Sequence, residues 1–356
     1  MNRALVDALL GFFAQGACSD AEFDAMALRL FVEQHAHNPA FRRFCQLRGA
    51  TPRTVKSWRD IPAVPISAFK EVTLSCTPPE QAERVFMTSG TTRGDVKGRH
   101  YHPTIAVWDA SFTPNFAQRF MQGTPRLRMA VLFPNEQEMP NSSLAHYLAM
   151  AVRHFGTGDS AYFVDLQGMD VPGLRDFLRS AQESGEPCAV LGASYSFVHF
   201  LDALGEQRFC LPPGSRILDT GGYKGQARQL PLEQFYAQVS AGFGVPRERC
   251  INMYGMTELS SQFYDEGNAR VPSVKSGPHW LRSRVIDPLT GRDMPPGERG
   301  VLVHCDLASF NSVTTILTED VGVAVDGGFL LLGRAEGAQA RGCSLAVQEF
   351  LQAARA

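Results

Sequence analysis

The sequence lacks the features that mark several large classes of protein. No apolar stretch reaches the roughly eighteen residues that a membrane-spanning helix needs. No basic run is present, and 34 Lys and Arg residues nearly balance 36 Asp and Glu residues, so the formal net charge is -2. Such a balance argues against a nucleic-acid-binding surface. We therefore expect neither a membrane span nor a nucleic-acid partner.

The eight cysteines are scattered and form no CxxC pair or His/Cys cluster with the spacing of a zinc site. This pattern predicts reduced thiols and a cytoplasmic protein. Residues 1–20 also differ from a signal peptide, because Asp7, Gln15 and Asp20 interrupt their apolar residues. We expect an amphipathic helix in this segment.

Helical and strand-like patterns alternate through the middle of the chain. Strands that alternate with helices of ten or so residues indicate βαβ units and a mostly parallel sheet, so the fold class is α/β. The expected helices are 103–121, 142–155, 171–183, 194–205 and 231–242, and the expected strands are 127–133, 160–165, 188–191, 215–219 and 249–253.

The flanking regions follow other patterns. Residues 1 to about 50 have helical apolar spacing, and the prolines in 58–70 predict an extended connector. From about residue 259 the segments are shorter and rich in β-formers, which predicts a small β subdomain, and SLAVQEFLQAARA at the end predicts one short helix. We expect a helical cap and connector (1–80), a core (81–332) and a short tail (333–356).

The stretch FMTSGTTRGDVKGRH (86–100) combines glycines, hydroxyls and cations. Backbone N–H groups of such a turn can converge on phosphate oxygens, because no Cβ blocks the approach. Lys97 and Arg93 can neutralise phosphate charge. The stretch is not a Walker loop, since Asp95 stands where that motif needs a glycine. A plain strand-to-helix turn is the alternative.

Two further motifs follow predicted strands. In ILDTGGYKG, Gly221 and Gly222 allow the backbone to lie against a planar group, and Tyr223 offers an aromatic face for a purine; a tight turn is the alternative. In NMYGMTEL, Thr257 and Glu258 stand at a strand's carboxyl end, where α/β sheets present ligands, so Glu258 is a candidate for Mg²⁺. A surface turn is the alternative there.

Asp320 and Arg334 complete the pattern. A carboxylate that accepts from both ribose hydroxyls is a recurring nucleoside-binding device, although either residue alone is compatible with a solvated surface charge. GASYS (192–196) differs from a nucleophile elbow because Ser196 replaces the second glycine, so we do not favour hydrolase chemistry.

The order of these four motifs resembles that of the adenylate-forming (acyl-CoA ligase-like) superfamily, from about Phe86 to Gly342. Within it, the chain resembles the acyl-protein synthetase family, the LuxE-type long-chain-fatty-acid–protein ligases. The residues that carry this likeness are IPAVPISAFK (61–70), TSGTTRGDVKG (88–98), NSSLAHYLAM (141–150), TGGYKG (220–225) and RGCSLA (341–346).

The resemblance implies an adenylation core without the full C-terminal domain. It also implies ATP and Mg²⁺ as cofactors, a carboxylic acid of the fatty type as substrate, and acyl transfer to a thiol by way of acyl-AMP. The acceptor would be Cys343 and then a partner such as a reductase or acyl carrier protein. Two alternatives stay open: transfer to coenzyme A or a carrier-protein phosphopantetheine, and a non-catalytic nucleotide-binding subunit.

The resemblance also implies roles for individual residues. Thr257 would contact the α-phosphate, Glu258 would hold Mg²⁺, and Cys343 would accept the acyl group. His146 would line the substrate pocket. The implied ATP-binding residues are Thr88, Ser89, Gly90, Thr91 and Thr92 for the pyrophosphate, Gly221, Gly222, Tyr223 and Tyr254 near the base, and Asp320 and Arg334 for the ribose.

Two features depart from the superfamily pattern. The mobile C-terminal domain with its catalytic lysine is expected to be absent, so Lys97, Lys224 or Lys70 would balance the charge, and Lys97 is our candidate. The hinge segment, which usually carries a lysine shortly before the final Arg-Gly, reads EGAQARG (336–342). In addition, Cys343 is expected to open the terminal helix beside Arg341. A helix N-terminus and a nearby cation both lower a thiol pKa, which would activate Cys343; a buried structural thiol is the alternative.

Overall fold

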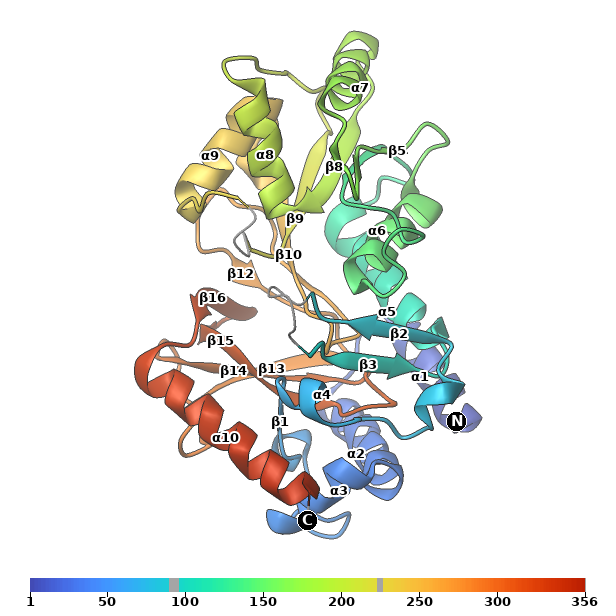
Figure 1. Cartoon of the computed structure of the whole chain (residues 1–356), viewed down its shortest axis with the longest axis vertical. Coiled ribbons are helices and arrows are strands. Elements are labelled where there is room, and N and C mark those ends of the chain that lie inside the picture. The colour runs from blue at the N-terminus through green and yellow to red at the C-terminus, as the bar shows by residue number, and fades with distance from the viewer. Residues whose placement is uncertain (90–95, 223–226, 356) are drawn as a thin grey trace. The chain divides into compact units, whose positions relative to one another are not determined.

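Two β-sheets of different kinds organise the chain in the computed structural model, which describes residues 1–89, 96–222 and 227–355 (Figure 1). Contacts divide the chain into two compact units. The first comprises Met1–Pro114, Met256–Gln262 and Val274–Ala356, and the second comprises Asn115–Gly255 and Phe263–Ser273. This division differs from the three consecutive segments expected from the sequence, because the N-terminal helices and the tail helix pack within one unit.

The second unit is an α/β fold around a mostly parallel sheet with the strand order β11–β10–β9–β8–β4–β5. The strands are β4 (Arg128–Leu132), β5 (Ala161–Tyr162), β8 (Cys188–Ala193), β9 (Arg216–Thr220), β10 (Cys250–Tyr254) and the antiparallel β11 (Phe263–Tyr264). The predicted mostly parallel sheet is confirmed. The expected strand 160–165 is divided, because β6 (Val164–Asp165) leaves the sheet to pair with β7 (Gly168–Met169).

The strand order reverses direction at β4. From β4 the chain passes through α6 (Ser143–Phe155) to β5, and it then returns through α7 (Val171–Ser184), α8 (Ser194–Leu204) and α9 (Leu232–Phe243) to β8, β9 and β10. Right-handed crossovers in opposite directions place α6 on one face and the other three helices on the opposite face (Figure 1). Ligands of such sheets bind at the carboxyl ends of strands near this reversal.

The strands of this sheet are buried on both faces, which explains their nearly continuous apolar sequences. All six residues of β8 and all five of β9 are buried. One face packs with α7, α8 and α9 in a single cluster that includes Phe177, Phe197 and Phe243. This core holds the carboxyl ends of the strands in place.

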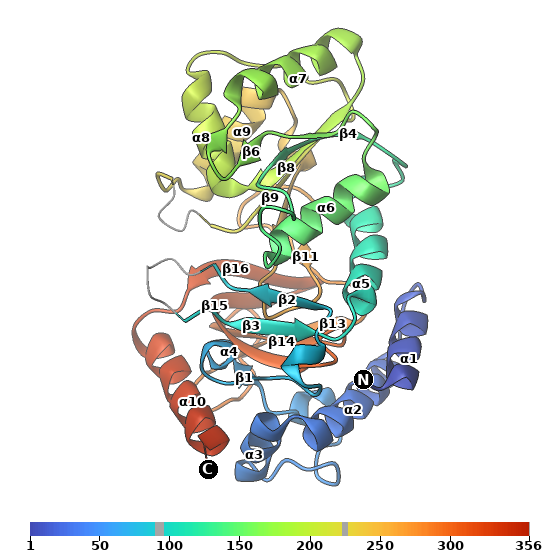
Figure 2. The ribbon, with the colours of Figure 1, turned by 45° about the vertical axis from the view of Figure 1, so that its right-hand side comes forward.

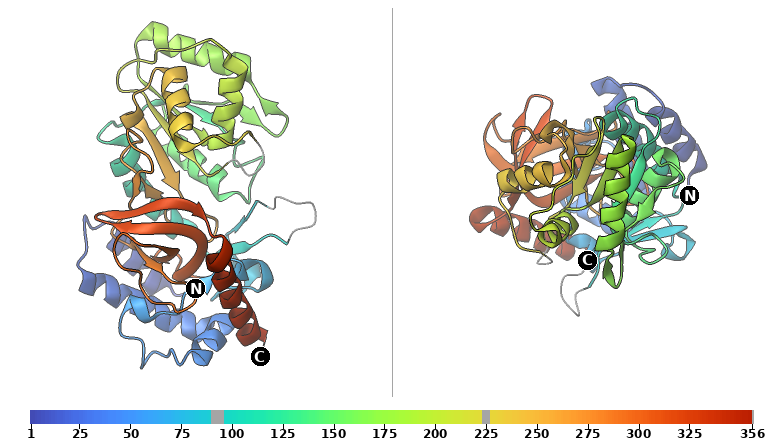
Figure 3. Two further views of the ribbon diagram at one scale, coloured as in Figure 1. Left: turned by 90° about the vertical axis from the view of Figure 1, so that its left-hand side faces the viewer. Right: turned by 90° about the horizontal axis from the view of Figure 1, so that it is seen from above.

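The first unit contains a curved antiparallel sheet with the order β12–β16–β15–β14–β13, to which β1 (Val64–Pro65) adds a short parallel pairing with β15 (Figure 3). The other strands are β12 (Val274–Lys275), β13 (Leu281–Ile286), β14 (Arg299–Asp306), β15 (Thr315–Val325) and β16 (Gly328–Arg334). The predicted small β subdomain is thus a half-barrel, and part of the expected connector is one of its strands.

Helices surround this half-barrel. They are α1 (Arg3–Phe13), α2 (Asp20–His37), α3 (Pro39–Leu47), α4 (Ala68–Glu71), the first part of α5 (Ala106–Phe116) and α10 (Gly337–Arg355). A capping box starts α2: Ser19 Oγ accepts from Glu22 N, and the Glu22 carboxylate accepts from Ser19 N. The predicted N-terminal helices are confirmed, but the tail helix begins at Gly337, earlier than expected.

The far end of α10 returns to α3 (Figure 2). The rings of Phe44 and Phe350 meet edge to face with centroids 5.0 Å apart, and Arg48 Nε donates to Glu349 Oε1 at 2.9 Å. The tail therefore lies docked on the first unit. In the described residues, no helix has the length and apolar character required to cross a membrane.

Candidate functional site

The stretch predicted to bind phosphate connects β2 (Arg84–Met87) to β3 (Arg99–His102), which pair as an antiparallel hairpin. A strand follows it, so the strand-to-helix turn considered from the sequence is wrong. Thr88 N donates to Gly98 O at 3.0 Å, and Gly98 N donates to Thr88 Oγ1 at 2.9 Å. A Cβ at Gly98 would lie 3.2 Å from Thr88 Cγ2, so the absence of a side chain permits this closure.

The remaining predicted residues of this stretch fall on both sides of that closure. Ser89 and Lys97 are described and exposed. The candidates Gly90, Thr91 and Thr92, with Arg93 and Asp95, lie outside the described residues. The described part therefore defines where the glycine-rich segment begins and ends.

His100 connects the hairpin to the segment of Thr257 and Glu258. Its side chain is buried, its Nδ1 lies 2.9 Å from Thr257 O, and its Nε2 lies 2.9 Å from Ser312 Oγ. Since a carbonyl oxygen only accepts, Nδ1 carries the proton and Nε2 accepts from Ser312. Burial lowers the pKa of His100 to about 4, which keeps the ring neutral. The sequence analysis missed this residue, because nothing local distinguishes it.

Glu258 has a buried carboxyl group in a mixed electrostatic environment. Only 6% of the residue is exposed, and burial raises its pKa to about 7. The positive charges of Lys70 and Arg334 oppose that rise, whereas Glu319 adds to it. A strongly perturbed carboxyl group between cations is typical of a functional site. Its single carboxylate suits Mg²⁺ that is held mainly by phosphate oxygens.

A second buried carboxylate, Asp306, shapes the segment that follows Glu258. It accepts from Ser260 N and Ser261 N at 2.8 Å, from Ser261 Oγ at 2.7 Å and from Ala308 N at 3.0 Å. Asp306 is fully buried. These bonds fix the backbone just beyond Glu258, so Asp306 is a structural support that sequence reasoning did not identify.

The structure brings together the two residues expected to bind ribose. Asp320 on β15 pairs in register with Arg334 on β16, and Arg334 Nη1 donates to Asp320 Oδ1 at 3.2 Å. Arg334 Nη2 also lies 3.5 Å from Glu319 Oε2. The guanidinium is mostly exposed, while the Asp320 carboxylate is mostly buried. The pair therefore presents a carboxylate held in place by a cation.

Cys343 differs from the expectation drawn from the sequence. It is the seventh residue of α10 and not its first, and only 5% of it is exposed. Its thiol faces an apolar cluster with Ile286, Val303 and Leu317, and its Sγ lies 3.8 Å from Thr318 O. Burial and the nearby Glu319 raise its pKa to about 11. The predicted activation at a helix N-terminus is therefore wrong.

In the second unit, Gly221 and Gly222 directly follow β9. Gly221 has φ +75°, a conformation that favours glycine. The buried Asp219 supports this turn by accepting from Ser194 Oγ at 2.8 Å and Tyr236 OH at 3.0 Å. Tyr223 and Lys224 lie outside the described residues. Asp219 was missed by sequence reasoning, although it immediately precedes the Thr-Gly-Gly motif.

The two other candidates in this unit are buried. Tyr254 ends β10 and packs on Phe263 with ring centroids 5.8 Å apart. His146 on α6 has its Nδ1 2.9 Å from Glu136 Oε2, and Arg153 Nη2 lies 3.1 Å from the other oxygen of Glu136. The imidazole expected to line a substrate pocket is therefore paired with a carboxylate of the chain itself.

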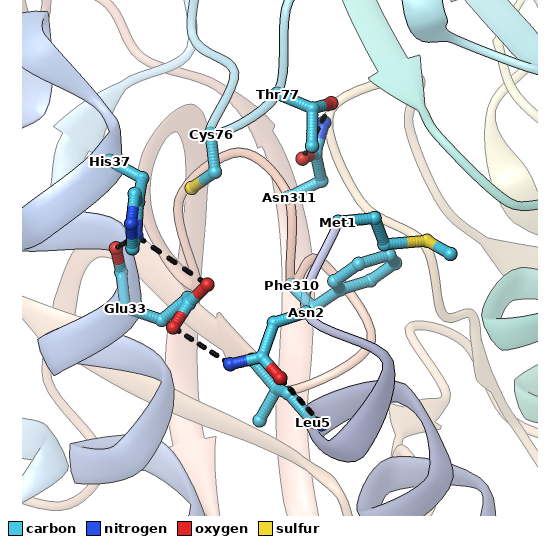
Figure 4. A pocket seen from close by; sticks show the side chains of 9 residues that line it. All are labelled: Met1, Asn2, Leu5, Glu33, His37, Cys76, Thr77, Phe310 and Asn311. Carbon is cyan, nitrogen blue, oxygen red and sulfur yellow. Dashed lines mark hydrogen bonds and ion pairs between the residues drawn. The ribbon is translucent and has the colours of Figure 1, made fainter.

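A cavity of about 350 Å³ opens elsewhere in the first unit, beside α1 and α2 (Figure 4). Glu33 Oε1 lies 3.5 Å from His37 Nδ1, and Glu33 Oε2 accepts from Asn2 Nδ2 at 3.0 Å. Thr77 Oγ1 donates to Asn311 Oδ1 at 3.1 Å. None of the residues predicted for nucleotide binding lines it. The cavity is thus distinct from the arrangement around Glu258.

Comparisons with known proteins identify the family of the chain. The family model described as "Acyl-protein synthetase, LuxE" matches residues 18–352. The long-chain-fatty-acid–luciferin-component ligase of Vibrio harveyi is 22% identical over 300 residues, which are 82% of this chain and 76% of that protein. The ligase of the same name from Aliivibrio fischeri is 22% identical over 307 residues, or 84% of this chain and 78% of that protein.

Solved structures show the fold. The structure of 2-hydroxyisobutyryl-CoA ligase in the postadenylation state, in complex with 2-HIB-AMP, superposes with a TM-score of 0.65 at 16% identity, covering 88% of this chain and 67% of that one. The same ligase with 2-HIB-AMP and CoA gives 0.64 at 18% identity, covering 88% and 68%. The fold is that of adenylate-forming ligases, as the sequence predicted.

Proposed function

Because the LuxE family model matches nearly the whole chain, the protein belongs to the acyl-protein synthetase family LuxE, and we propose that it activates a carboxylic acid with ATP. The acid is proposed to be fatty, since both curated relatives are long-chain fatty-acid ligases. The product would be an acyl-AMP, from which the acyl group passes to a thiol. The family resemblance supports these finer statements.

One observation supports the adenylation step above all. His100 holds the strand that leaves the glycine-rich segment against the backbone of Thr257, the residue before Glu258. Two motifs far apart in sequence thereby share one place in the first unit. We propose that this place holds the phosphates, with Thr88, Ser89 and Lys97 on the hairpin side and Thr257 on the other.

The carboxylate oxygen of the acid would attack the α-phosphorus, and the bond from that phosphorus to the bridging oxygen would break. The electron pair leaves with pyrophosphate, and no proton moves in this step. Mg²⁺, when bound through Glu258, would supply positive charge to the phosphates. Asp320, oriented by Arg334, would accept from ribose hydroxyls. Gly221, Gly222 and Tyr254 remain candidates for contact with the base, and His146 for the acid.

Acyl transfer to Cys343 requires more than the docked tail provides. A thiol with a pKa near 11 is protonated at neutral pH, and only 5% of this residue is exposed. The sulfur would have to lose its proton before it attacks the acyl carbon and displaces AMP. We therefore propose that α10 leaves its docked position for this step, which raises the thiolate fraction and exposes the sulfur.

The burial of Cys343 favours a second candidate function. If α10 stays docked, the acceptor would be coenzyme A or a carrier-protein phosphopantetheine, and Cys343 would be structural. The fold shared with CoA ligases is compatible with this alternative. A third possibility, a nucleotide-binding subunit without catalysis, predicts no exchange of pyrophosphate into ATP with any acid.

The test is carboxylate-dependent ATP–pyrophosphate exchange over acids of graded length, followed by intact-mass analysis. We expect exchange with an apolar acid and an acyl adduct on the chain that Cys343→Ala abolishes and Cys210→Ala, at an exposed cysteine, retains. An acyl group found only on an added thiol, with no adduct on the chain, would support the second candidate. An adduct that survives in Cys343→Ala would reject Cys343 as the acceptor. The absence of exchange with every acid would reject both.

A further inference from the structure

Lys70 lies beside the closure between Thr88 and Gly98, which forms the neck of the glycine-rich segment, and its helix α4 is labelled in Figure 2. It belongs to the short helix α4, and a Cβ at Gly98 would lie 3.5 Å from Phe69 Cβ and 3.6 Å from Lys70 Cγ. The aliphatic stem of Lys70 therefore packs against Gly98, the partner of Thr88, while the residue as a whole is exposed. Lysine commonly buries its stem in this way and leaves the ammonium in water.

The helix of Lys70 also lies close to the segment of Thr257 and Glu258. The ring of Phe69, the residue before Lys70, meets the ring of His100 edge to face with centroids 5.8 Å apart, and His100 Nδ1 donates to Thr257 O at 2.9 Å. Arg334, the cation expected at the ribose, is already paired with Asp320 and Glu319. Among the described parts of the chain, no ion pair joins Lys70 to a carboxylate. Within the described residues, Lys70 is thus a cation near this segment whose charge is not matched by an acidic partner.

Adenylation gathers negative charge where Glu258 lies. A triphosphate, an acid and the Glu258 carboxylate are all anionic, and the leaving pyrophosphate gains a further charge when the P–O bond breaks. Preorganised cations at such a position lower the barrier, and the loss of one such group typically reduces the rate by about 10²–10³-fold. A cation in addition to Mg²⁺ would therefore speed this step.

We propose that Lys70 is a catalytic residue of this site, whose ammonium contacts the phosphate oxygens next to Glu258 and stabilises the charge on departing pyrophosphate. This inference rests on the proposed adenylation function. The lysine keeps its proton throughout, and the electron pair of the broken bond leaves with pyrophosphate. Lys97, the exposed residue before Gly98, would then serve in binding the terminal phosphates.

A chemical probe tests the position of Lys70 without relying on turnover. The chain contains only five lysines, at positions 56, 70, 97, 224 and 275. An ATP analogue with a reactive acyl ester on its terminal phosphate transfers that acyl group to a lysine amine beside the phosphates and releases ATP. We expect Lys70 to be labelled, together with Lys97, with at least about tenfold suppression by MgATP, and Lys56 not to be labelled.

Kinetics then test its role. In Lys70→Gln we expect the exchange kcat to fall by about 10²–10³-fold, while calorimetry gives a Kd for MgATP within about threefold of the wild type. Lys70→Arg keeps the charge and should recover activity to within about tenfold of the wild type. Lys56→Gln, at an exposed lysine in the same unit, is the matched control and should change neither quantity.

Several results would overturn the assignment. They are an exchange kcat for Lys70→Gln within threefold of the wild type, a MgATP-protected label on other lysines but not on Lys70, and a fall in kcat that Lys70→Arg does not reverse. Failure of the proposed function has a different signature. In that case the wild type shows no exchange with any acid, while a MgATP-protected label on Lys70 would still support its place beside the phosphates.

Discussion

Thr88 and Gly98 bond to each other in both directions, N–H to carbonyl at 3.0 Å and N–H to hydroxyl at 2.9 Å. Thr88→Val keeps the shape of the side chain but removes the hydroxyl acceptor. Because an unsatisfied N–H costs about 1–3 kcal/mol, we expect MgATP affinity measured by calorimetry to fall by about tenfold. Thr88→Ser keeps the acceptor and serves as the control. Equal affinity in Thr88→Val would show that the neck does not position phosphate contacts.

The thiol of Cys343 should react slowly in the resting protein, because it is buried and its pKa is near 11. With iodoacetamide at pH 7.5, peptide mass analysis should show the exposed Cys210 alkylated well before Cys343. Addition of MgATP and an active acid should speed the alkylation of Cys343 if α10 leaves its docked position. Rapid alkylation of Cys343 without ligands would contradict the docked tail.

The docking of α10 should depend far more on Phe350 than on Arg48. Phe350 is fully buried, and Phe→Ala at such sites costs about 3–5 kcal/mol. The Arg48–Glu349 pair is substantially exposed, and such pairs contribute about 0–1 kcal/mol. In a Cys210→Ser background, Phe350→Ala should therefore raise the alkylation rate of Cys343 by at least about tenfold, and Arg48→Ala by less than about threefold. The reverse order would refute this account.

His304 should make the protein less stable in acid. It is fully buried, Ser283 Oγ lies 2.8 Å from its Nδ1, and burial lowers its pKa to about 3. Below about pH 6.5 this histidine takes up a proton in the unfolded chain but not in the folded chain. Its contribution to the free energy of unfolding is therefore fully present above that pH. The contribution is lost at up to about 1.4 kcal/mol per pH unit as the pH falls towards 3.

Urea unfolding at pH 7.5 and pH 5.5 measures this contribution. His304→Asn retains a polar side chain without a titrating proton, so its free energy of unfolding should change with pH by roughly 1 kcal/mol less than that of the wild type. The comparison uses the difference between the two pH values, so any loss common to both cancels. Parallel pH profiles would mean that His304 takes up a proton in the folded state.

Asp306 should matter for both stability and ligand binding. Asp306→Asn places an amide against donors, so we expect a loss of about 2–3 kcal/mol in urea unfolding and a weaker MgATP affinity, since the backbone beyond Glu258 shifts. Asp293→Asn is the control, because Asp293 is a half-exposed partner of Arg59 and Arg284 and should cost less than about 1 kcal/mol. If Asp306→Asn is destabilised but binds MgATP with unchanged affinity, Asp306 supports the stability of the fold and not ligand binding.

The parallel sheet was predictable because its signals are local. The apolar run of β8 and the periodicity of α8 place both elements within a few residues of their observed bounds. β3 was not predicted, because its sequence RHYH looks polar while three of its four residues are buried. Its histidines are accommodated by contacts such as that of His100 with Thr257, which no local pattern reveals.

The candidate site shows the same division. Thr257, Glu258, Asp320 and Arg334 were identified from motif order, and the last two do pair. Asp306 supports the backbone beyond Glu258 from a distant position in the chain, which no local motif reveals. The start of α10 was misjudged because Gly337 and Gly342 disfavour a helix locally, whereas packing on the half-barrel stabilises it. That error placed Cys343 at a helix terminus and led to the wrong pKa direction.

The interruption of the first unit by the second bears on biosynthesis. Val64 pairs with Ile316, so β1 finds its partner only after about 250 further residues have been synthesised. Residues 115–255 leave the ribosome earlier and carry nearly all of their own sheet. Until then the N-terminal helices expose apolar side chains that the half-barrel later covers, so we expect the nascent chain to bind chaperones. For the same reason we expect a C-terminal truncation that removes β15 to fold poorly.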